Sequence, residues 1–329
     1  MELVCPAGNL PALKIAVDNG ADTVYIGFGD DTNARHFAGL NFNEDRANQG
    51  VEYAHARGRK VYVAINTYPQ PSGWQRWTDA IDRAARIGAD AVILADIGLM
   101  AYAKNSHPEM NLHLSVQGSA TSYEALDFYC QNFNVKRAVL PRVLSVAQVK
   151  KAIENSPVEI EVFGFGSLCV MVEGRCILSS YATGRSPNTY GACSPASHVE
   201  YIENDIQLET RLGGVLIDSY EKHEPAGYPT LCKGRFEAMG NTYYALEEPT
   251  SLNTLDILPE LKKIGVKAIK IEGRQRSPAY IRTVTKTWSE ALKQLDRGHY
   301  QTKSEWNRAL SEISEGFQTT LGAYHRSWQ

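Results

Sequence analysis

Short apolar runs alternate along the chain with longer segments in which apolar residues recur at helical spacing. The runs extend from Leu3 to Cys5, Thr23 to Gly27, Lys60 to Asn66, Ala91 to Ala95, Leu112 to Val116, Arg137 to Leu140, Glu159 to Phe163 and Lys267 to Ile271. A brief, almost continuous apolar run is typical of a strand that is buried on both faces of a parallel sheet. Such strands, alternating with helices, predict an α/β fold of the TIM-like (β/α)8 barrel type.

The ends of the predicted helices support this alternation. Gly20, Gly88 and Gly265 each follow a helical segment and precede an apolar run. Helices commonly end in a glycine, because the residue after the last turn often needs a positive φ. Each of the three glycines is therefore expected to mark a helix-to-strand junction.

The eighth strand comes late in the sequence, near Lys267, whereas the seventh ends near Phe163. The interval contains short alternating runs, which predict a β-rich insertion after strand seven; they are Val199 to Ile202, Gly214 to Ile217 and Arg235 to Leu246. The predicted organisation is barrel strands one to seven in 1–168, the insertion in 169–250, the last helix–strand–helix part of the barrel in 251–300, and a C-terminal tail without an assigned structure in 301–329.

Composition narrows the class of protein. The 329 residues carry a formal net charge of −3, and lysine and arginine do not gather in blocks, which disfavours a nucleic-acid partner. The sequence contains no apolar run of transmembrane length, and its first residues lack the pattern of a signal peptide. We therefore expect a cytoplasmic protein without a transmembrane segment, in a compartment where thiols stay reduced.

Four cysteines lie within the predicted insertion: Cys169, Cys176, Cys193 and Cys232. They avoid the strands and helices of the barrel, and each has glycine, proline or serine nearby, as metal-binding loops do. Buried, unliganded thiols are the simplest alternative, because free cysteine is often a packing residue. The remaining two, Cys5 in a strand and Cys130 in a helix, fit that packing role.

The spacing of the four cysteines leaves the metal open. Structural zinc sites usually contain pairs of cysteines separated by two residues, and no such pair occurs here. Iron–sulfur clusters accept wider spacings, so the pattern slightly favours iron over zinc. The sequence therefore predicts a thiolate-bound metal centre on the insertion.

Several polar residues follow the predicted strands, at the end of the barrel where (β/α)8 enzymes carry their active sites. The candidate binding residues are Arg35, Gln117, Arg142, Arg274 and Arg276, and the candidate acid–base residues are His36, Asp96 and Glu272. A lone loop histidine is usually a solvated side chain, and the residues after strand eight could equally form a structural salt-bridge network. If they are functional, the arginines suit an anionic, oxygen-rich ligand.

The run Glu161-x-Phe-x-x-Gly166-Ser167-Leu168-Cys169-x4-Gly174-x-Cys176-x-Leu178-Ser179 resembles the signature of the collagenase-like peptidase family U32. Pro6-Ala-Gly8 after the first strand and Lys270-Ile-Glu-Gly-Arg274 after the eighth extend the resemblance over the barrel. Finer motifs, among them Ala226-Gly-Tyr-Pro-Thr-Leu-Cys-Lys-Gly234 and Glu247-Glu-Pro-Thr-Ser-Leu-Asn-Thr254, are similar to the UbiU-type branch of that family.

This resemblance implies an oxygen-independent hydroxylase subunit of ubiquinone biosynthesis, active as a heterodimer with a homologous UbiV-like subunit. It implies a [4Fe–4S] cluster whose ligands are Cys169, Cys176, Cys193 and Cys232. The implied reaction adds a hydroxyl group to the aromatic ring of a prenylated quinone precursor under anaerobic conditions, and a lipid-binding accessory protein could deliver that precursor. Relatives that hydroxylate RNA bases use prephenate, so prephenate is the expected oxygen donor.

Three other functions stay open. The chain could be a prephenate-dependent RNA base hydroxylase of the same family, or a non-catalytic Fe–S scaffold whose partner holds the substrate. A peptidase is the least favoured, because the sequence contains neither an H-E-x-x-H motif nor a recognisable nucleophilic triad.

Overall fold

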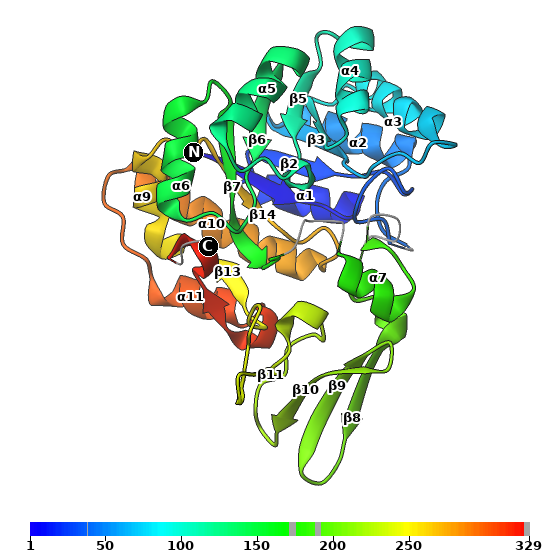
Figure 1. The fold of residues 1–329 in the computed structure, drawn as a ribbon. Coiled ribbons are helices and arrows are strands. Elements are labelled where there is room, and N and C mark those ends of the chain that lie inside the picture. Colours follow the sequence, from blue (N-terminus) through cyan, green and yellow to red (C-terminus); the bar gives the residue numbers. More distant parts are fainter. Residues whose placement is uncertain (38, 171–175, 188–191, 326–329) are drawn as a thin grey trace.

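Eight parallel strands close into a barrel in the computed structural model, which describes residues 1–37, 39–170, 176–187 and 192–325 (Figure 1). The strands are β1 (Glu2–Pro6), β2 (Thr23–Ile26), β3 (Lys60–Ile65), β4 (Ala91–Leu94), β5 (Asn111–Leu114), β6 (Val135–Val139), β7 (Glu159–Ser167) and β14 (Ala268–Ile271). Each pairs with its neighbour in chain order, and β14 pairs with both β1 and β7 to complete the circle. The predicted (β/α)8 barrel is confirmed.

Helices surround the barrel (Figure 1). They are α1 (Leu10–Asp18), α2 (Glu44–His55), α3 (Trp74–Arg86), α4 (Ile97–Ser106), α5 (Tyr123–Phe133), α6 (Val146–Asn155), α9 (Leu258–Lys263) and α10 (Pro278–Asp296). Gly20, Gly88 and Gly265 have φ values of +98°, +73° and +98°, as their predicted place at helix ends requires. Among the described residues, no helix is both long and apolar enough to cross a membrane.

The interior of the barrel is more polar than its outer layer. Alternate strand residues point inward, and a small apolar group that includes Val4, Tyr62 and Ile93 fills the middle. At the end where the strands begin, Arg137 pairs with both Glu2 and Glu159 at 2.8 Å. These ion pairs tie the first strand to the sixth and seventh across the base of the barrel.

The ion pair of Glu2 predicts a pH-dependent contribution to stability. Burial opposes the carboxylate, but the hydrogen bond and charge of Arg137 outweigh it and lower the pKa of Glu2 to about 2. The contribution is therefore complete above about pH 5 and is lost as the pH falls towards 2. We expect Glu2→Gln to lower the free energy of unfolding by about 3 kcal/mol at pH 6 and far less near pH 2. Urea unfolding at both pH values measures this, and an equal loss at both would contradict it.

The segment after β7 is rich in strands and projects away from the barrel (Figure 1). It begins with α7 (Ile177–Thr183) and continues as a three-stranded antiparallel sheet, followed by a hairpin; the strands are β8 (Val199–Glu203), β9 (Gln207–Leu212), β10 (Val215–Glu221), β11 (Phe236–Ala238) and β12 (Asn241–Tyr243). The β-rich character follows the prediction, although the sequence did not mark β9 as a strand. Residues 171–175 and 188–191 of this insertion lie outside the described residues.

The C-terminal segment returns to the seventh strand. After α11 (Ser304–Ser311), β15 (Thr319–Thr320) pairs with β13 (Ser251–Asn253), which itself runs antiparallel to the end of β7. The hydroxyl of Tyr324 donates a hydrogen bond to the carbonyl of Phe163 at 3.1 Å. The tail, to which the sequence assigned no structure, thus pairs with β13 and is bonded to β7 through Tyr324. Residues 326–329 lie outside the described part.

Candidate functional site

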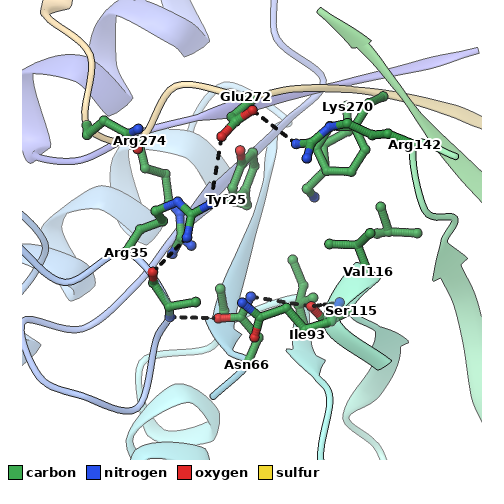
Figure 2. Close-up of a pocket in the computed structure, with 16 residues that line it drawn as sticks. Tyr25, Arg35, Asn66, Ile93, Ser115, Val116, Arg142, Lys270, Glu272 and Arg274 are labelled. Atoms are coloured by element: carbon green, nitrogen blue, oxygen red, sulfur yellow. Dashed lines mark hydrogen bonds and ion pairs between the residues drawn. The ribbon is translucent and has the colours of Figure 1, made fainter. Parts of the chain in front are cut away.

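A small pocket of about 60 Å³ lies at the carboxyl ends of the strands. Figure 2 shows Glu272 between two guanidinium groups, with Arg142 at 3.0 Å and Arg35 at 3.9 Å. Glu272 follows β14, whereas Arg142 follows β6 and Arg35 lies in the loop after β2. The carboxylate therefore joins three separate strand ends, and all three residues were predicted from those positions.

The strand ends hold these side chains in fixed orientations. The guanidinium carbon of Arg142 lies 3.6 Å from the centroid of the Phe163 ring, on which the side chain stacks. Arg274 is buried, and its Nη1 donates to the side-chain oxygen of Asn33 at 3.0 Å. Planar groups held by stacking and directed hydrogen bonds lose little further freedom when a ligand binds.

Positive charge exceeds negative charge in the pocket. Among the described residues that line it, Arg35, Arg142 and Arg274 outnumber the one carboxylate, Glu272, while Lys270 is paired with the buried Glu161 at 2.7 Å. Burial lowers the pKa of Arg274 to about 10, because a buried cation has lost its hydration. Burial opposes the Glu272 carboxylate too, but Arg142 and Arg35 outweigh it and lower its pKa. An anion in this pocket would restore the balance of charge.

A larger cavity of about 680 Å³ adjoins the pocket and shares Arg35, Arg142 and Glu272 with it. Its wall includes the four clustered cysteines; they are Cys169, Cys176, Cys193 and Cys232. We call it the cysteine cavity. The fold therefore brings thiols as far apart in sequence as Cys169 and Cys232 to one space that opens beside the barrel pocket.

The four cysteines lie at different places in the fold. Cys169 follows the end of β7, Cys176 is the residue before α7, and Cys232 lies in a 3-10 turn, Leu231–Lys233. Cys232 is buried and Cys193 is exposed. Burial raises the pKa of the Cys232 thiol to about 12, so a cation is needed to hold it as a thiolate near neutral pH.

The chemistry of this donor set fits a thiolate-bound metal centre, because soft sulfur ligands select zinc and iron–sulfur clusters. Among the described residues, no three cysteine, histidine or carboxylate side chains already stand in a metal-binding arrangement. Residues 171–175 and 188–191, which lie between the first three cysteines along the chain, are not among the described residues. The assignment of the four cysteines as ligands therefore stays a prediction.

The other predicted site residues line either the barrel pocket or the cysteine cavity, except Asp96. Gln117 lines the barrel pocket, whereas His36 and Arg276 line the cysteine cavity. Asp96 is absent from both sets of lining residues: it caps α4, where its carboxylate accepts a hydrogen bond from the amide of Leu99 at 3.0 Å. The structure thus gives Asp96 a capping role, which the sequence analysis did not consider.

The capping role of Asp96 can be tested by substitution. Asp96→Ala leaves the amide of Leu99 without its side-chain acceptor, so we expect the free energy of unfolding to fall by about 1 kcal/mol. Asp96→Asn retains an acceptor and is expected to restore most of that loss. Chemical denaturation measures both variants, and a loss of turnover at full stability would instead support the catalytic assignment.

Several pocket residues were absent from the predicted sets of binding and acid–base residues. Tyr25, Asn66, Ser115 and Lys270 all line the barrel pocket. The signal was present, because Tyr25 and Lys270 each interrupt an apolar strand with a polar group, and alternate residues of a barrel strand point inward. The candidates were taken from residues beyond each predicted strand, which left out Tyr25 and Lys270 within the strands, and Asn66 at the end of its strand was not assigned a role.

Comparison with known proteins identifies the family. The model of "Peptidase family U32" matches residues 8–327. The chain belongs to this family. The "Uncharacterized protease MJ0090" of Methanocaldococcus jannaschii is 32% identical over 93% of this chain and 68% of its own length. Two Escherichia coli relatives have names that refer to RNA hydroxylation or to a hydroxylated RNA base.

The first of these is "tRNA hydroxylation protein P", which is 31% identical to this chain over 96% of it and 72% of the relative. The second is "23S rRNA 5-hydroxycytidine C2501 synthase", which is 29% identical over 99% of this chain but 44% of the relative. The U32 family therefore includes proteins of RNA hydroxylation as well as proteins named as proteases.

Proposed function

We propose that this U32 protein is the Fe–S subunit of an O2-independent hydroxylase that acts on the aromatic ring of a prenylated ubiquinone precursor. It would be active with a UbiV-like homologous subunit. The observation that supports this most directly is the junction of a four-cysteine cavity with a cationic pocket at the catalytic end of a (β/α)8 barrel. The hydroxylation named in the relatives supports the reaction class.

Cys169, Cys176, Cys193 and Cys232 would hold a [4Fe–4S] cluster in the cysteine cavity. Such a cluster supplies one-electron chemistry when it is bound. The neighbouring cation Lys233 favours thiolate at Cys232, since its charge opposes the effect of burial on the pKa of that thiol.

The barrel pocket would hold the carboxylate groups of the oxygen donor, and the rest of that molecule would extend into the adjoining cysteine cavity. Prephenate carries two carboxylates, and the excess of guanidinium groups around Glu272 suits a dianion. Arg142 and Arg274 present rigid, planar donors for carboxylate oxygens, and Gln117 lines the same pocket. The donor would bind there by charge-assisted hydrogen bonds, close to the shared wall of the cysteine cavity.

The ring of the quinone precursor would enter the cysteine cavity, which is large and mainly lined by carbon. Phe37, Pro195 and Tyr228 contribute apolar wall, and a lipid-binding accessory protein could deliver the prenylated molecule. His36 lines the same cavity, with Nδ1 at 3.0 Å from the carbonyl oxygen of Asn33. A carbonyl only accepts, so Nδ1 carries the proton, and Nε2 is left to exchange a proton with the ring.

RNA base hydroxylation is the second candidate, because two relatives are named for it. The net charge of −3 gives this chain little general attraction for a phosphate backbone. We therefore rank ring hydroxylation first. A cluster-bearing scaffold without catalysis is the third candidate, and a true peptidase is not proposed.

Deletion of the gene distinguishes the first two functions. Mutant cells grown without O2 should lose most of their ubiquinone and accumulate a precursor with fewer ring hydroxyl groups, while cells grown with O2 keep theirs. Mass spectrometry of lipids and of digested tRNA and rRNA from the same cultures measures both outcomes. Normal ubiquinone together with a missing RNA hydroxyl would favour the RNA function.

A further inference from the structure

The C-terminal segment contacts residues within and on both sides of the insertion, which comprises residues 169–250. Glu315 forms an ion pair with Lys233, the residue next to Cys232, and both side chains are nearly inaccessible, at 7% and 2% exposure. The ammonium of Lys233 also donates to the hydroxyl of Ser167 at 3.0 Å, two residues before Cys169. One buried lysine thus links the tail with Ser167, just before the insertion, and with the segment inside the insertion that carries Cys232.

Further contacts fix the tail in this position. The amide of Glu315 donates to the hydroxyl of Ser251 at 2.9 Å, and the amide of Ser251 donates to the carbonyl of Gln318 at 3.1 Å. Gly322, with a φ of +55°, packs against Leu168, so that even an added Cβ would stand 3.0 Å from that side chain. The tail is therefore anchored on β13 and touches the residue that precedes Cys169.

We propose that Glu315 and Lys233 are positioning residues for the thiol-bound metal, acting by locking Cys169 and Cys232 against the barrel. This inference rests on the proposed function, because it requires the four cysteines to hold a cluster. Both residues line the cysteine cavity, and a buried ion pair loses much of its benefit when one partner is removed. The tail then determines how firmly the metal is kept, without supplying a ligand.

The test compares the rate at which anaerobically purified full-length protein loses iron to a chelator. Glu315→Gln is expected to lose iron about tenfold faster than the wild type, because one buried charge is left without its partner. Glu312→Gln is the matched control: Glu312 is an exposed carboxylate on the same segment, and its loss rate should equal that of the wild type.

A double variant separates metal positioning from general stability. Lys233→Met combined with Glu315→Met replaces the buried charges by apolar side chains, so the melting temperature of metal-free protein should recover. Rapid iron loss should persist, since the bond from Lys233 to Ser167 is also gone. Equal iron loss in wild type and Glu315→Gln, or recovery of iron retention in the double variant, would overturn the inference. Wild-type protein that binds no iron would overturn the proposed cluster as well.

Discussion

Cys193→Ser is expected to abolish the bound iron and the colour of the anaerobically purified protein. The wild type should contain about four irons and about four acid-labile sulfides per chain, with a broad absorption band near ~400 nm. Cys193 is an exposed residue on the wall of the cysteine cavity, so its replacement removes a proposed ligand without opening a hole in the packed core. Turnover by the proposed heterodimer should fall to background.

Cys130→Ser provides the matched control for this experiment. Cys130 lies on α5 and packs against the core of the barrel, apart from the residues that line the cavity. This variant should keep its iron, sulfide and visible spectrum. Stoichiometric zinc in the wild type, or iron that survives in Cys193→Ser, would contradict the assignment of a four-cysteine cluster.

Arg142→Gln is expected to lower kcat/KM for the oxygen donor by about 100-fold. A charge-assisted hydrogen bond to a carboxylate contributes about 1.5–3 kcal/mol, and the glutamine also leaves the nearly buried Glu272 with weaker compensation. The loss should appear mainly in KM for the donor if Arg142 binds it equally in the ground state and the transition state. Anaerobic turnover with varied prephenate measures both constants.

Two measurements accompany the Arg142 variant. Arg86→Gln removes a guanidinium from the exposed surface pair with Glu44, and its turnover should match that of the wild type. The iron content of Arg142→Gln should also be normal, which would separate donor binding from cluster retention. Unchanged kcat/KM in Arg142→Gln would place the reaction on the partner and favour the scaffold function for this chain.

The sequence predicted the barrel well because its strands are short, apolar and separated by capped helices. Lys60 to Asn66 and Ala91 to Ala95, for example, lie within one residue of β3 and β4. The ends of these strands then located Arg35, Arg142 and Glu272 on one face, because parallel strands present their carboxyl ends together. The strands could be predicted because they show a local apolar pattern, and the site residues because the strand order of a (β/α)8 barrel is fixed.

Contacts between residues that are distant in sequence left no comparable pattern along the chain. The tail is polar and its strand β15 has two residues, so nothing in its periodicity shows that it pairs with β13. The partners Lys233 and Glu315 stand 82 positions apart and look like ordinary surface charges in the sequence. Asp96 shows a related ambiguity: a carboxylate after a strand can serve a ligand or the next helix, and here it accepts a hydrogen bond from the amide of Leu99.

The contact between Glu315 and Lys233 also has a consequence for biogenesis. A ribosome makes the chain from its amino end, so the four cysteines are synthesised well before Glu315 and Tyr324, which secure their loops to β7. The barrel itself closes only when β14 has been made, after all four thiols. In a nascent chain that has not yet reached Glu315, the four thiols consequently lack their final surroundings, so a metal centre there would be completed only after β14 and the tail have joined the fold.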